Sequence, residues 1–374
     1  MRHSITVALT TCGIILGSLV SVAHAADTKV NCNSPGANGK IGTVLSRLDP
    51  AAANIVHVSG SCHENVVIQG FERLSLIAMP GAVIADASGG ALAVVEILYS
   101  QVMVQGFTIQ GGSNGLLCHH LSSCLFTADT VEDTVPYTGI NAGITIDGSD
   151  AELTNIVVRN VADAGIALWG AKAVASNVSV NGVKNVNPFP GGTGVIMSAS
   201  SLRNGPITIQ YADGTGLQAL HGTVLDISAL SVTDNGMRGS GFPNGVSIAD
   251  GSVGNFGQLT VQRNQGAGIL AQGGSNINIY GANGIISNNT GPGIFLQWGA
   301  RLIHFANTTV TNNQFGLYAT DVSLAVFGGG TFTQNTITDI SCDGPPPALV
   351  LGIGSVVFGS TDCPPPPLAP AKVH

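Results

Sequence analysis

Short apolar runs alternate with turn residues along the chain, and from about residue 140 onward no helical period of 3.6 residues survives. An alternating strand is followed several times by an asparagine that comes a few residues before a glycine-aliphatic pair, at Asn160, Asn235, Asn264, Asn289 and Asn313. A glycine followed by an aliphatic residue recurs at separations of 22, 29, 22, 29, 23, 25 and 23 residues, at Gly143-Ile144, Gly165-Ile166, Gly194-Val195, Gly216-Leu217, Gly245-Val246, Gly268-Ile269, Gly293-Ile294 and Gly316-Leu317.

A unit of about 22 residues that holds only short strands cannot bury its apolar face alone, so it must stack on copies of itself. We therefore predict an all-β solenoid in which the aliphatic residues after the glycines form one interior ladder. The longer separations are interpreted as the same unit with an inserted loop. The asparagines are expected to stack as well, because Asn tolerates left-handed backbone and its amide satisfies polar groups of a turn.

The pattern before residue 140 is looser but similar. Residues 41–48 have an amphipathic pattern that ends at Asp49-Pro50, which predicts a short helix capping the open N-terminal end of the solenoid. The predicted organisation is a signal peptide at 1–25, an N-terminal cap at 26–65, a solenoid at 66–362 with a loop insertion at 111–138, and a Pro-rich disordered tail at 363–374.

The first 25 residues have the pattern of a secretory signal: a basic start, an apolar stretch over residues 5–22 and a small-x-small cleavage site at residues 23–25. Cleavage would leave 12 basic against 21 acidic residues, a net charge of −9. This balance argues against nucleic acid or an anionic membrane as partner. No later apolar run is long enough to span a membrane. We expect a secreted or periplasmic protein.

The cysteines of the predicted mature chain are even in number, as expected for a disulfide-bonded exported protein: Cys32, Cys62, Cys118, Cys124, Cys342 and Cys363. Pairing in sequence order is favoured, because each neighbouring pair brackets one local structure. No Cys-x-x-Cys spacing, phosphate-binding glycine loop or zinc-type histidine cluster occurs, so we expect no metal and no cofactor.

Residues 41–48, 55–60 (IVHVSG) and 64–68 (ENVVI), followed by the Gly-aliphatic and Asn repeats, resemble the pectate-lyase-like superfamily over roughly residues 40–360. The resemblance implies a right-handed parallel β-helix. It does not imply one activity, because that superfamily holds lyases, hydrolases, esterases, epimerases and adhesins. The signature residues of its polygalacturonases, lyases and methylesterases do not occur in this sequence.

In a strand the residues two and four positions after each glycine face outward. The first predicted outward column is Thr145, Ala167, Ile196, Gln218, Ser247, Leu270, Phe295 and Tyr318. The second is Asp147, Trp169, Ser198, Leu220, Ala249, Gln272, Gln297 and Thr320, with His221 and Trp298 just past the strand ends. Rings can stack on sugars and amides can pair with hydroxyls. The candidate binding residues are therefore Trp169, Gln218, Gln272, Phe295, Gln297, Trp298 and Tyr318; coverage by inserted loops is the alternative.

The segment 111–138 holds His119 and His120 between two cysteines, followed by Asp129, Glu132 and Asp133. A Cys118–Cys124 disulfide is expected to make a rigid loop that presents both histidines. His with carboxylates can perform acid–base work, so the candidate catalytic residues are Asp147, His119 and His120.

The leading hypothesis is an exported β-helix protein that contacts polysaccharide or cell-envelope glycan through its strand face. The first alternative is a carbohydrate-active enzyme, a polysaccharide lyase or glycoside hydrolase. The second is an adhesin or structural surface protein. The sequence leaves open whether the protein is an enzyme, and it does not specify an oligomeric state.

Overall fold

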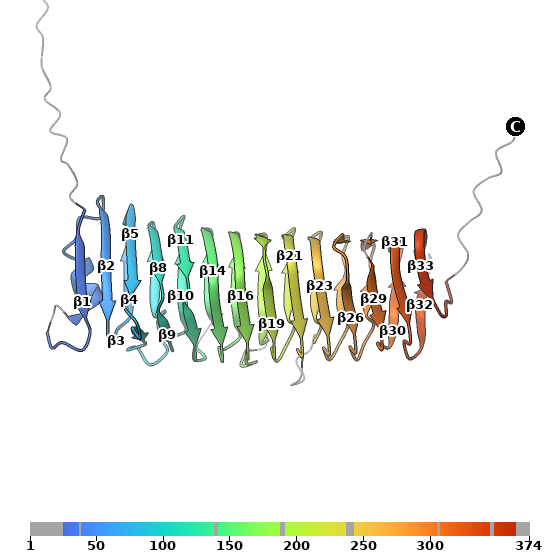
Figure 1. Ribbon diagram of the computed structural model, residues 1–374, viewed down its shortest axis with the longest axis horizontal. Helices are drawn as coiled ribbons and strands as arrows, with labels where there is room; N and C mark the ends of the chain where they lie inside the picture. Colours follow the sequence, from blue (N-terminus) through green and yellow to red (C-terminus); the bar gives the residue numbers. More distant parts are fainter. Residues whose placement is uncertain are drawn as a thin grey trace, which may run out of the picture.

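The computed structural model describes residues 25–36, 39–137, 141–187, 191–236, 243–304, 307–344 and 348–363, and of residues 351–355 it describes the backbone alone. The signal segment and the Pro-rich tail, apart from Ala25 and Cys363, lie outside these residues. The strands stack into one long solenoid that runs from β1 to β33 (Figure 1). All strand pairs of the described residues are parallel, as the stacking of repeats predicts.

Two sheets wrap the solenoid. The 12-stranded sheet takes one strand from each coil: β4 (Val66–Gln69), β7 (Val95–Leu98), β10 (Asn114–His119), β13 (Ala142–Asp147), β15 (Ala164–Trp169), β17 (Thr193–Ser198), β20 (Leu217–Leu220), β22 (Val246–Ile248), β24 (Ile269–Ala271), β27 (Ile294–Leu296), β30 (Phe315–Thr320) and β32 (Thr338–Asp343).

The 21-stranded sheet takes the remaining strands, which are either long and bent or split in two. They are β1 (Asp27–Asn31), β2 (Ala53–Ser59), β3 (Ser61–His63), β5 (Arg73–Ala78), β6 (Val83–Ala85), β8 (Gln101–Gln105), β9 (Thr108–Gln110), β11 (Ser123–Thr127), β12 (Thr130–Glu132), β14 (Asp150–Arg159), β16 (Lys172–Asn181), β18 (Ser201–Asn204), β19 (Ile207–Gln210), β21 (Val224–Thr233), β23 (Val253–Gln262), β25 (Asn276–Ile279), β26 (Gly284–Ser287), β28 (Arg301–His304), β29 (Thr308–Thr311), β31 (Leu324–Thr333) and β33 (Leu349–Phe358).

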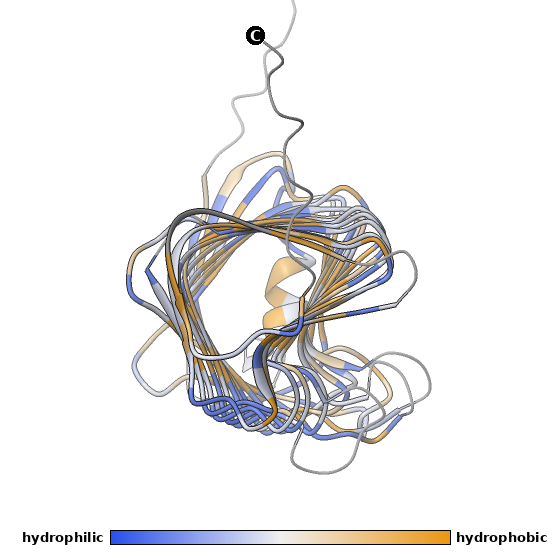
Figure 2. Ribbon diagram, turned by 90° about the vertical axis from the view of Figure 1, so that its right-hand side faces the viewer, coloured by the Kyte–Doolittle hydropathy of each residue, from blue (hydrophilic) through white to orange (hydrophobic). Residues whose placement is uncertain are grey.

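The predicted interior ladder is confirmed. Strand register places Ile144 beside Ile166 and Ile166 beside Val195, and the ladder continues through the later coils to Leu317. These side chains are buried. Viewed along the long axis, successive coils superpose closely, so the same position of each repeat lies in one row (Figure 2).

The repeating glycine has a steric cause. A Cβ added at Gly165 would lie 2.4 Å from the carbonyl oxygen of Gly194 in the next coil, and one added at Gly194 would lie 2.5 Å from the carbonyl oxygen of Gly216. Heavy atoms cannot approach this closely, so any larger residue must push two coils apart. The Gly-aliphatic pair is therefore a packing signature of the solenoid.

Four of the five predicted asparagines stack in a buried ladder. The side-chain oxygen of Asn264 accepts hydrogen bonds from the backbone and side-chain nitrogens of Asn235, and Asn289 and Asn313 repeat this arrangement. Asn335 extends the ladder by one coil. The prediction was wrong for Asn160, which is exposed and left-handed (φ 54°) because it lies one position before this row.

The N-terminal end differs from the predicted boundary. Parallel pairing already begins at β1, which pairs with β2, so the solenoid starts inside the segment that we assigned to a cap. The predicted capping helix over 41–48 is not confirmed as such. A single helical turn, α1 (Ile41–Leu45), is present, with Ile41, Val44 and Leu45 buried against the first coils.

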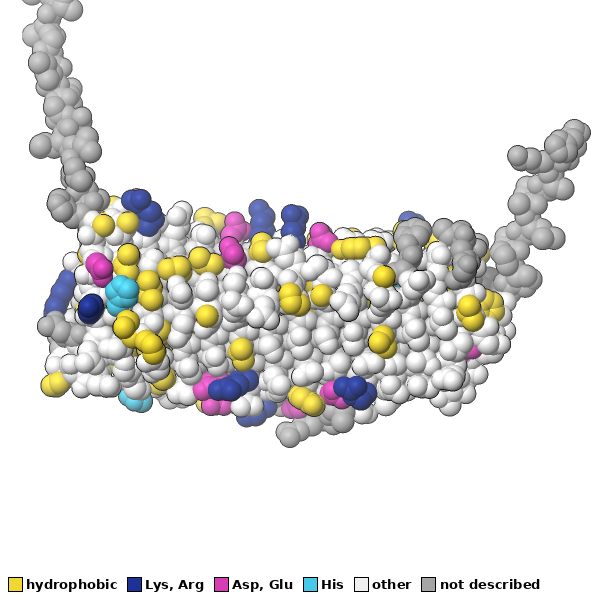
Figure 3. Space-filling model, viewed as in Figure 1, with side chains coloured by type: hydrophobic (Ala, Val, Ile, Leu, Met, Phe, Trp, Pro, Cys, Tyr) yellow, Lys and Arg dark blue, Asp and Glu magenta, His cyan; other side chains and the backbone are white. Residues whose placement is uncertain are grey.

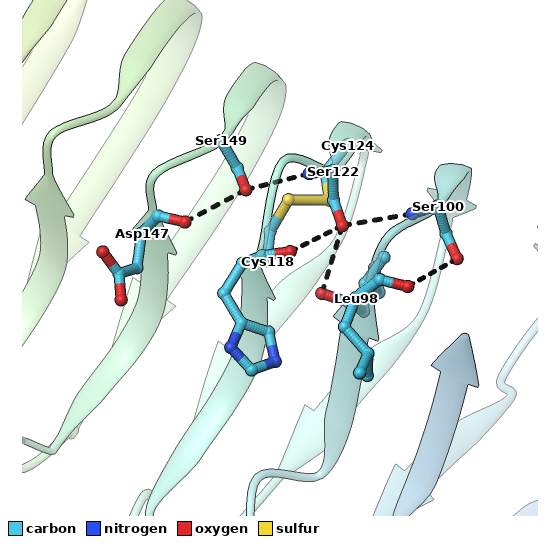
Figure 4. Close-up of a disulfide and its surroundings, with 9 residues drawn as sticks. Leu98, Ser100, Cys118, Ser122, Cys124, Asp147 and Ser149 are labelled. Carbon is cyan, nitrogen blue, oxygen red and sulfur yellow. Dashed lines mark hydrogen bonds between the residues drawn. A yellow bond between two sulfur atoms is a disulfide. The ribbon is translucent and has the colours of Figure 1, made fainter. Parts of the chain in front are cut away.

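Three disulfides join the cysteines in sequence order: Cys32–Cys62, Cys118–Cys124 and Cys342–Cys363. The prediction of a loop insertion at 111–138 was wrong. β10, β11 and β12 are in register with the coils on either side, and both Cys118 and Cys124 are buried. The disulfide lies between two strands of one coil, inside the turn that joins them (Figure 4).

One core position holds a carboxyl group. Asp129 is fully buried at a row position between Phe107 and Ile156. Its Oδ1 accepts a hydrogen bond from the backbone N–H of Phe107, whereas Oδ2 has no partner within the described residues. Burial raises the pKa of Asp129 to about 8, although the backbone hydrogen bonds oppose this shift.

Because the pKa of Asp129 is raised in the folded state, this group contributes fully to stability only at low pH, where its carboxyl is protonated in both states. This contribution is lost progressively as the pH rises from the unfolded-state value near 4 towards about 8. We expect Asp129→Asn to remove this part of the pH dependence and to stabilise the protein at pH 8. Guanidinium unfolding at pH 5 and pH 8 measures the effect. Equal pH slopes in the two proteins would contradict it.

Candidate functional site

The two predicted outward columns exist on the 12-stranded sheet. Cross-strand register aligns Thr145, Ala167, Ile196 and Gln218 in the first column, and Asp147, Trp169, Ser198 and Leu220 in the second. A third row follows in the turn after each strand and contains His221, Asp250 and Trp298. Adjacent strands of a sheet lie about 4.8 Å apart, so each column is a regular series of side chains along the solenoid.

Parts of the first column are buried. Ala167, Ile196, Ser247 and Leu270 are buried. Ala167 and Ile196 form a small apolar cluster with Ala142 and Ala164 outside the main core, and the ring of Trp169 packs against it. Trp169 therefore contributes to local packing, and it lies several coils away from the other predicted rings.

Five of the predicted binding residues gather on three consecutive coils, and we call them the C-terminal patch: Gln272, Phe295, Gln297, Trp298 and Tyr318. The rings of Phe295 and Tyr318 stack with centroids 5.1 Å apart, and Tyr318 also stacks on Phe315. The amide of Gln297 donates to the side-chain oxygen of Gln272 at 2.7 Å. Trp298 is 60% exposed. Gln218 lies two coils away from this patch.

The hydroxyl group of Tyr318 lies 3.1 Å from the carboxylate of Asp343 on the next strand, to which it donates a hydrogen bond. Burial, followed by this hydrogen bond and the nearby negative charge, raises the pKa of Tyr318. The phenol therefore stays neutral at ordinary pH and remains a donor. The contact fixes the ring at one edge of the C-terminal patch.

The candidate catalytic residues lie together near the other end. His119 and Asp147 are register partners on β10 and β13. Nε2 of His119 lies 3.0 Å from Oε1 of Glu96, and the two atoms form no hydrogen bond. The ring of His120, in the following turn, contacts His119 and Tyr99. The disulfide presents neither histidine on a protruding loop, because Cys118 faces the core while His119 faces outward.

The acidic residues of segment 111–138 do not join these histidines. Asp129 is in the core, and β12, which carries Glu132, belongs to the 21-stranded sheet. The carboxylate of Glu132 is paired with Arg159 and also accepts a hydrogen bond from Gln110. The hydrogen bond from Gln110, together with the contact to Arg159, lowers the pKa of Glu132. Asp129 and Glu132 therefore have structural roles.

The sequence did not reveal a shallow concave surface on the other sheet. It crosses the 21-stranded sheet over β2, β5, β8, β11, β14 and β16. One row of register partners on it runs through Ile55, Ser75, Met103, Leu125 and Glu152. No aromatic ring lines it. On the face seen in Figure 3, charged side chains gather mainly along two edges, with a broad uncharged band between them.

A family model described as a right handed beta helix region matches residues 193–347. No curated protein matches the chain. Among solved structures, the periplasmic alginate epimerase AlgG is similar with a TM-score of 0.53 and 12% identity, covering 88% of this chain and 83% of that chain. A single-site mutant of AlgG gives a TM-score of 0.53 at 13% identity, and a double mutant gives 0.52 at 12%, with coverages of 88% of this chain and 83% and 84% of those chains.

At identities this low, the structural similarity shows the fold alone, and the chemistry must be inferred from the site. Within the described residues, no helix is long and apolar enough to cross a membrane. The matching family region, the parallel register of the coils and the similarity to AlgG agree with one another. The chain therefore has a right-handed parallel β-helix fold.

Proposed function

We propose that this protein is exported and binds polysaccharide along the outer face of its 12-stranded sheet, with the C-terminal patch as the main contact. The observation that supports the proposal most is the gathering of rings and amides on three consecutive coils. Rings offer flat apolar faces or edges to sugar C–H groups, and amides offer both a donor and an acceptor to hydroxyls.

The charges of this face favour a neutral glycan. The two outward columns and the turn row contain Glu96, Asp147, Asp250, Asp321 and Asp343. They contain no lysine or arginine within the described residues. A polyuronate would bring its carboxylates against this acidic row, which costs binding free energy at low ionic strength. The proposal is therefore a neutral polysaccharide, in contrast to the alginate named for the epimerase AlgG.

Three disulfides fit a protein of an oxidising compartment, and the similar epimerase is periplasmic. We propose the periplasm or the cell exterior as the place where the protein meets its glycan.

The carbohydrate-active enzyme remains the second candidate, supported by the contact between His119 and Glu96 and by the register of His119 with Asp147.

We expect Trp298→Ala to weaken retention by a bound neutral polysaccharide by roughly 5-fold, because one exposed ring supplies about 1 kcal/mol of stacking. Gln297→Ala should also weaken retention, because it removes the amide pair with Gln272. Tyr280→Ala is the matched control, because Tyr280 is also an exposed ring but lies just after β25 of the other sheet. Affinity electrophoresis measures all three. Equal losses for Trp298→Ala and Tyr280→Ala would refute this location.

The same gels should be paired with an assay for unsaturated or reducing ends. Binding without release is the expected result. Release that survives in Trp298→Ala but disappears in Asp147→Asn or His119→Ala would replace the binding proposal with the enzyme.

A further inference from the structure

Three side chains on successive coils form a serine–histidine–aspartate series. Ser198 ends β17, His221 follows β20 and Asp250 lies in the turn after β22. The Oγ of Ser198 lies 2.9 Å from Nδ1 of His221, and Nε2 of His221 lies 3.7 Å from Oδ2 of Asp250. We propose that this series is a nucleophilic ester-hydrolysing site, which cleaves acyl esters of the glycan that the same face binds.

The contacts favour the proton positions that the chemistry needs. The carboxylate of Asp250 favours the imidazole tautomer with its proton on Nε2. Nδ1 then carries the lone pair and accepts the hydrogen bond of the Ser198 hydroxyl. This is the arrangement of an activated nucleophile, a base and an orienting acid, with the two ring nitrogens exchanged relative to the usual triad.

The solenoid holds the three groups in place without a dedicated loop. Register aligns Ser198 with Leu220, the residue before His221, and the backbone N–H of Gly222 donates to the carbonyl of Asp250. His221 and Asp250 both have left-handed backbone, at φ 54° and 55°, in the turn row that glycine fills at Gly148 and Gly170. The same backbone recurs in this row at Ala199, Trp298 and Asp321, so it belongs to the turn of the solenoid and fixes where both side chains start.

The site is open to a polymer. The side chains of His221 and Asp250 are 64% and 53% exposed, so a substituent on a bound glycan can reach them. Gln218 lies on the strand next to Ser198, two positions before Leu220, the register partner of Ser198. Diagonal neighbours of this kind are about 7–8 Å apart, within reach of a long side chain. Its amide has no hydrogen-bond partner within the described residues and can donate to the oxygen that becomes negative.

The reaction is balanced by water alone. The Oγ of Ser198 bonds to the acyl carbon while its proton moves to Nδ1 of His221, and Asp250 stabilises the imidazolium. The bond between the acyl carbon and the sugar oxygen breaks, and that oxygen takes the proton from His221. Water then attacks the acyl-serine, the carboxylic acid leaves and the Ser198 hydroxyl is restored. The sugar chain itself is not cut.

The test uses small probes, so that it does not depend on the glycan binding on which the biological role rests. The purified protein is treated with an alkyl fluorophosphonate, the modified peptide is mapped, and hydrolysis of p-nitrophenyl acetate is followed. We expect labelling at Ser198 and a loss of hydrolysis of roughly 10²-fold in Ser198→Ala and His221→Asn. Asp250→Asn should lower the rate of hydrolysis and slow the labelling of Ser198 without abolishing it. Ser176→Ala, an exposed serine on β16, is the control.

Absence of a phosphonate adduct on Ser198, or hydrolysis equal in Ser198→Ala and Ser176→Ala, would overturn the ester site and leave polysaccharide binding standing. Labelling of Ser198 in a protein that no polysaccharide retains would support the site and overturn the proposed binding face. The two proposals therefore fail separately. Circular dichroism of each variant confirms that the surface substitutions leave the solenoid folded.

Discussion

Gly194→Ala is expected to destabilise the folded protein by about 3 kcal/mol, because overpacking a fixed backbone contact is costly. A Cβ at this position would lie 2.3 Å from Cγ2 of Ile209 and 2.5 Å from the carbonyl oxygen of Gly216. The isoleucine side chain can rotate, but the carbonyl belongs to the backbone of the next coil. The coils must therefore separate, which weakens several hydrogen bonds between β17 and β20 at once.

Guanidinium unfolding followed by circular dichroism measures this effect. Gly42→Ala is the matched control, because a Cβ there would meet its nearest atom, an oxygen of Glu64, at an ordinary 3.6 Å. The steric explanation of the repeat predicts a large loss for Gly194→Ala and little change for Gly42→Ala. Similar midpoints for the two variants would contradict it.

Asn264→Ala is expected to cost about 4 kcal/mol, since buried polar groups that lose their partners carry a penalty of about 1–3 kcal/mol each. The side-chain oxygen of Asn264 accepts from the backbone and side-chain nitrogens of Asn235. Its nitrogen donates to the carbonyl of Val232 and to the side-chain oxygen of Asn289. Alanine would remove all four bonds, and water cannot replace them inside a packed row.

Asn276→Ala is the control for this variant. Asn276 is half-buried at the start of β25, and its side chain makes no hydrogen bond within the described residues. Its replacement should change the unfolding free energy by no more than about 0.5 kcal/mol. If both variants lost the same stability, the ladder would carry no special weight in the fold.

The fold was predictable because one pattern has one physical cause. The glycine must be small to admit the next coil, and the residue after it must be apolar to fill the core. This gave the interior ladder and both outward columns in the correct register. The same Gly-aliphatic pair also occurs at Gly115-Leu116, 28 residues before Gly143. A Cβ at Gly115 would lie 2.9 Å from the carbonyl oxygen of Gly143, which identifies segment 111–138 as a regular coil.

Other features depend on one-residue placement that the sequence pattern does not resolve. Asn160 looks like the later asparagines but lies one position before the interior row. In its coil that row is occupied by the next residue, Val161, which is buried. Asp129 and His304 are polar residues at core positions, and neither ring nitrogen of His304 has a hydrogen-bond partner within the described residues. Burial lowers the pKa of His304, so the imidazole stays neutral. A polarity pattern alone places such residues at the surface.

The candidate site was predictable in part. The column positions gave Gln272, Phe295, Gln297, Trp298 and Tyr318 as outward residues, and these lie together. The columns do not show which members are covered, because the packing of Trp169 on its small apolar cluster depends on neighbouring coils. The series of Ser198, His221 and Asp250 also needs the cross-coil register, since its members are separated by 23 and 29 residues in sequence.

The central claim is that the outer face of the 12-stranded sheet binds a neutral polysaccharide. Affinity electrophoresis of the purified protein through gels containing neutral glucans, xylans or galactomannans, beside gels containing alginate or polygalacturonate, tests it directly at low salt. The account predicts retention by at least one neutral polymer, none by the polyuronates, and no release of unsaturated or reducing ends. Retention by alginate alone, or cleavage of any polymer, would contradict it.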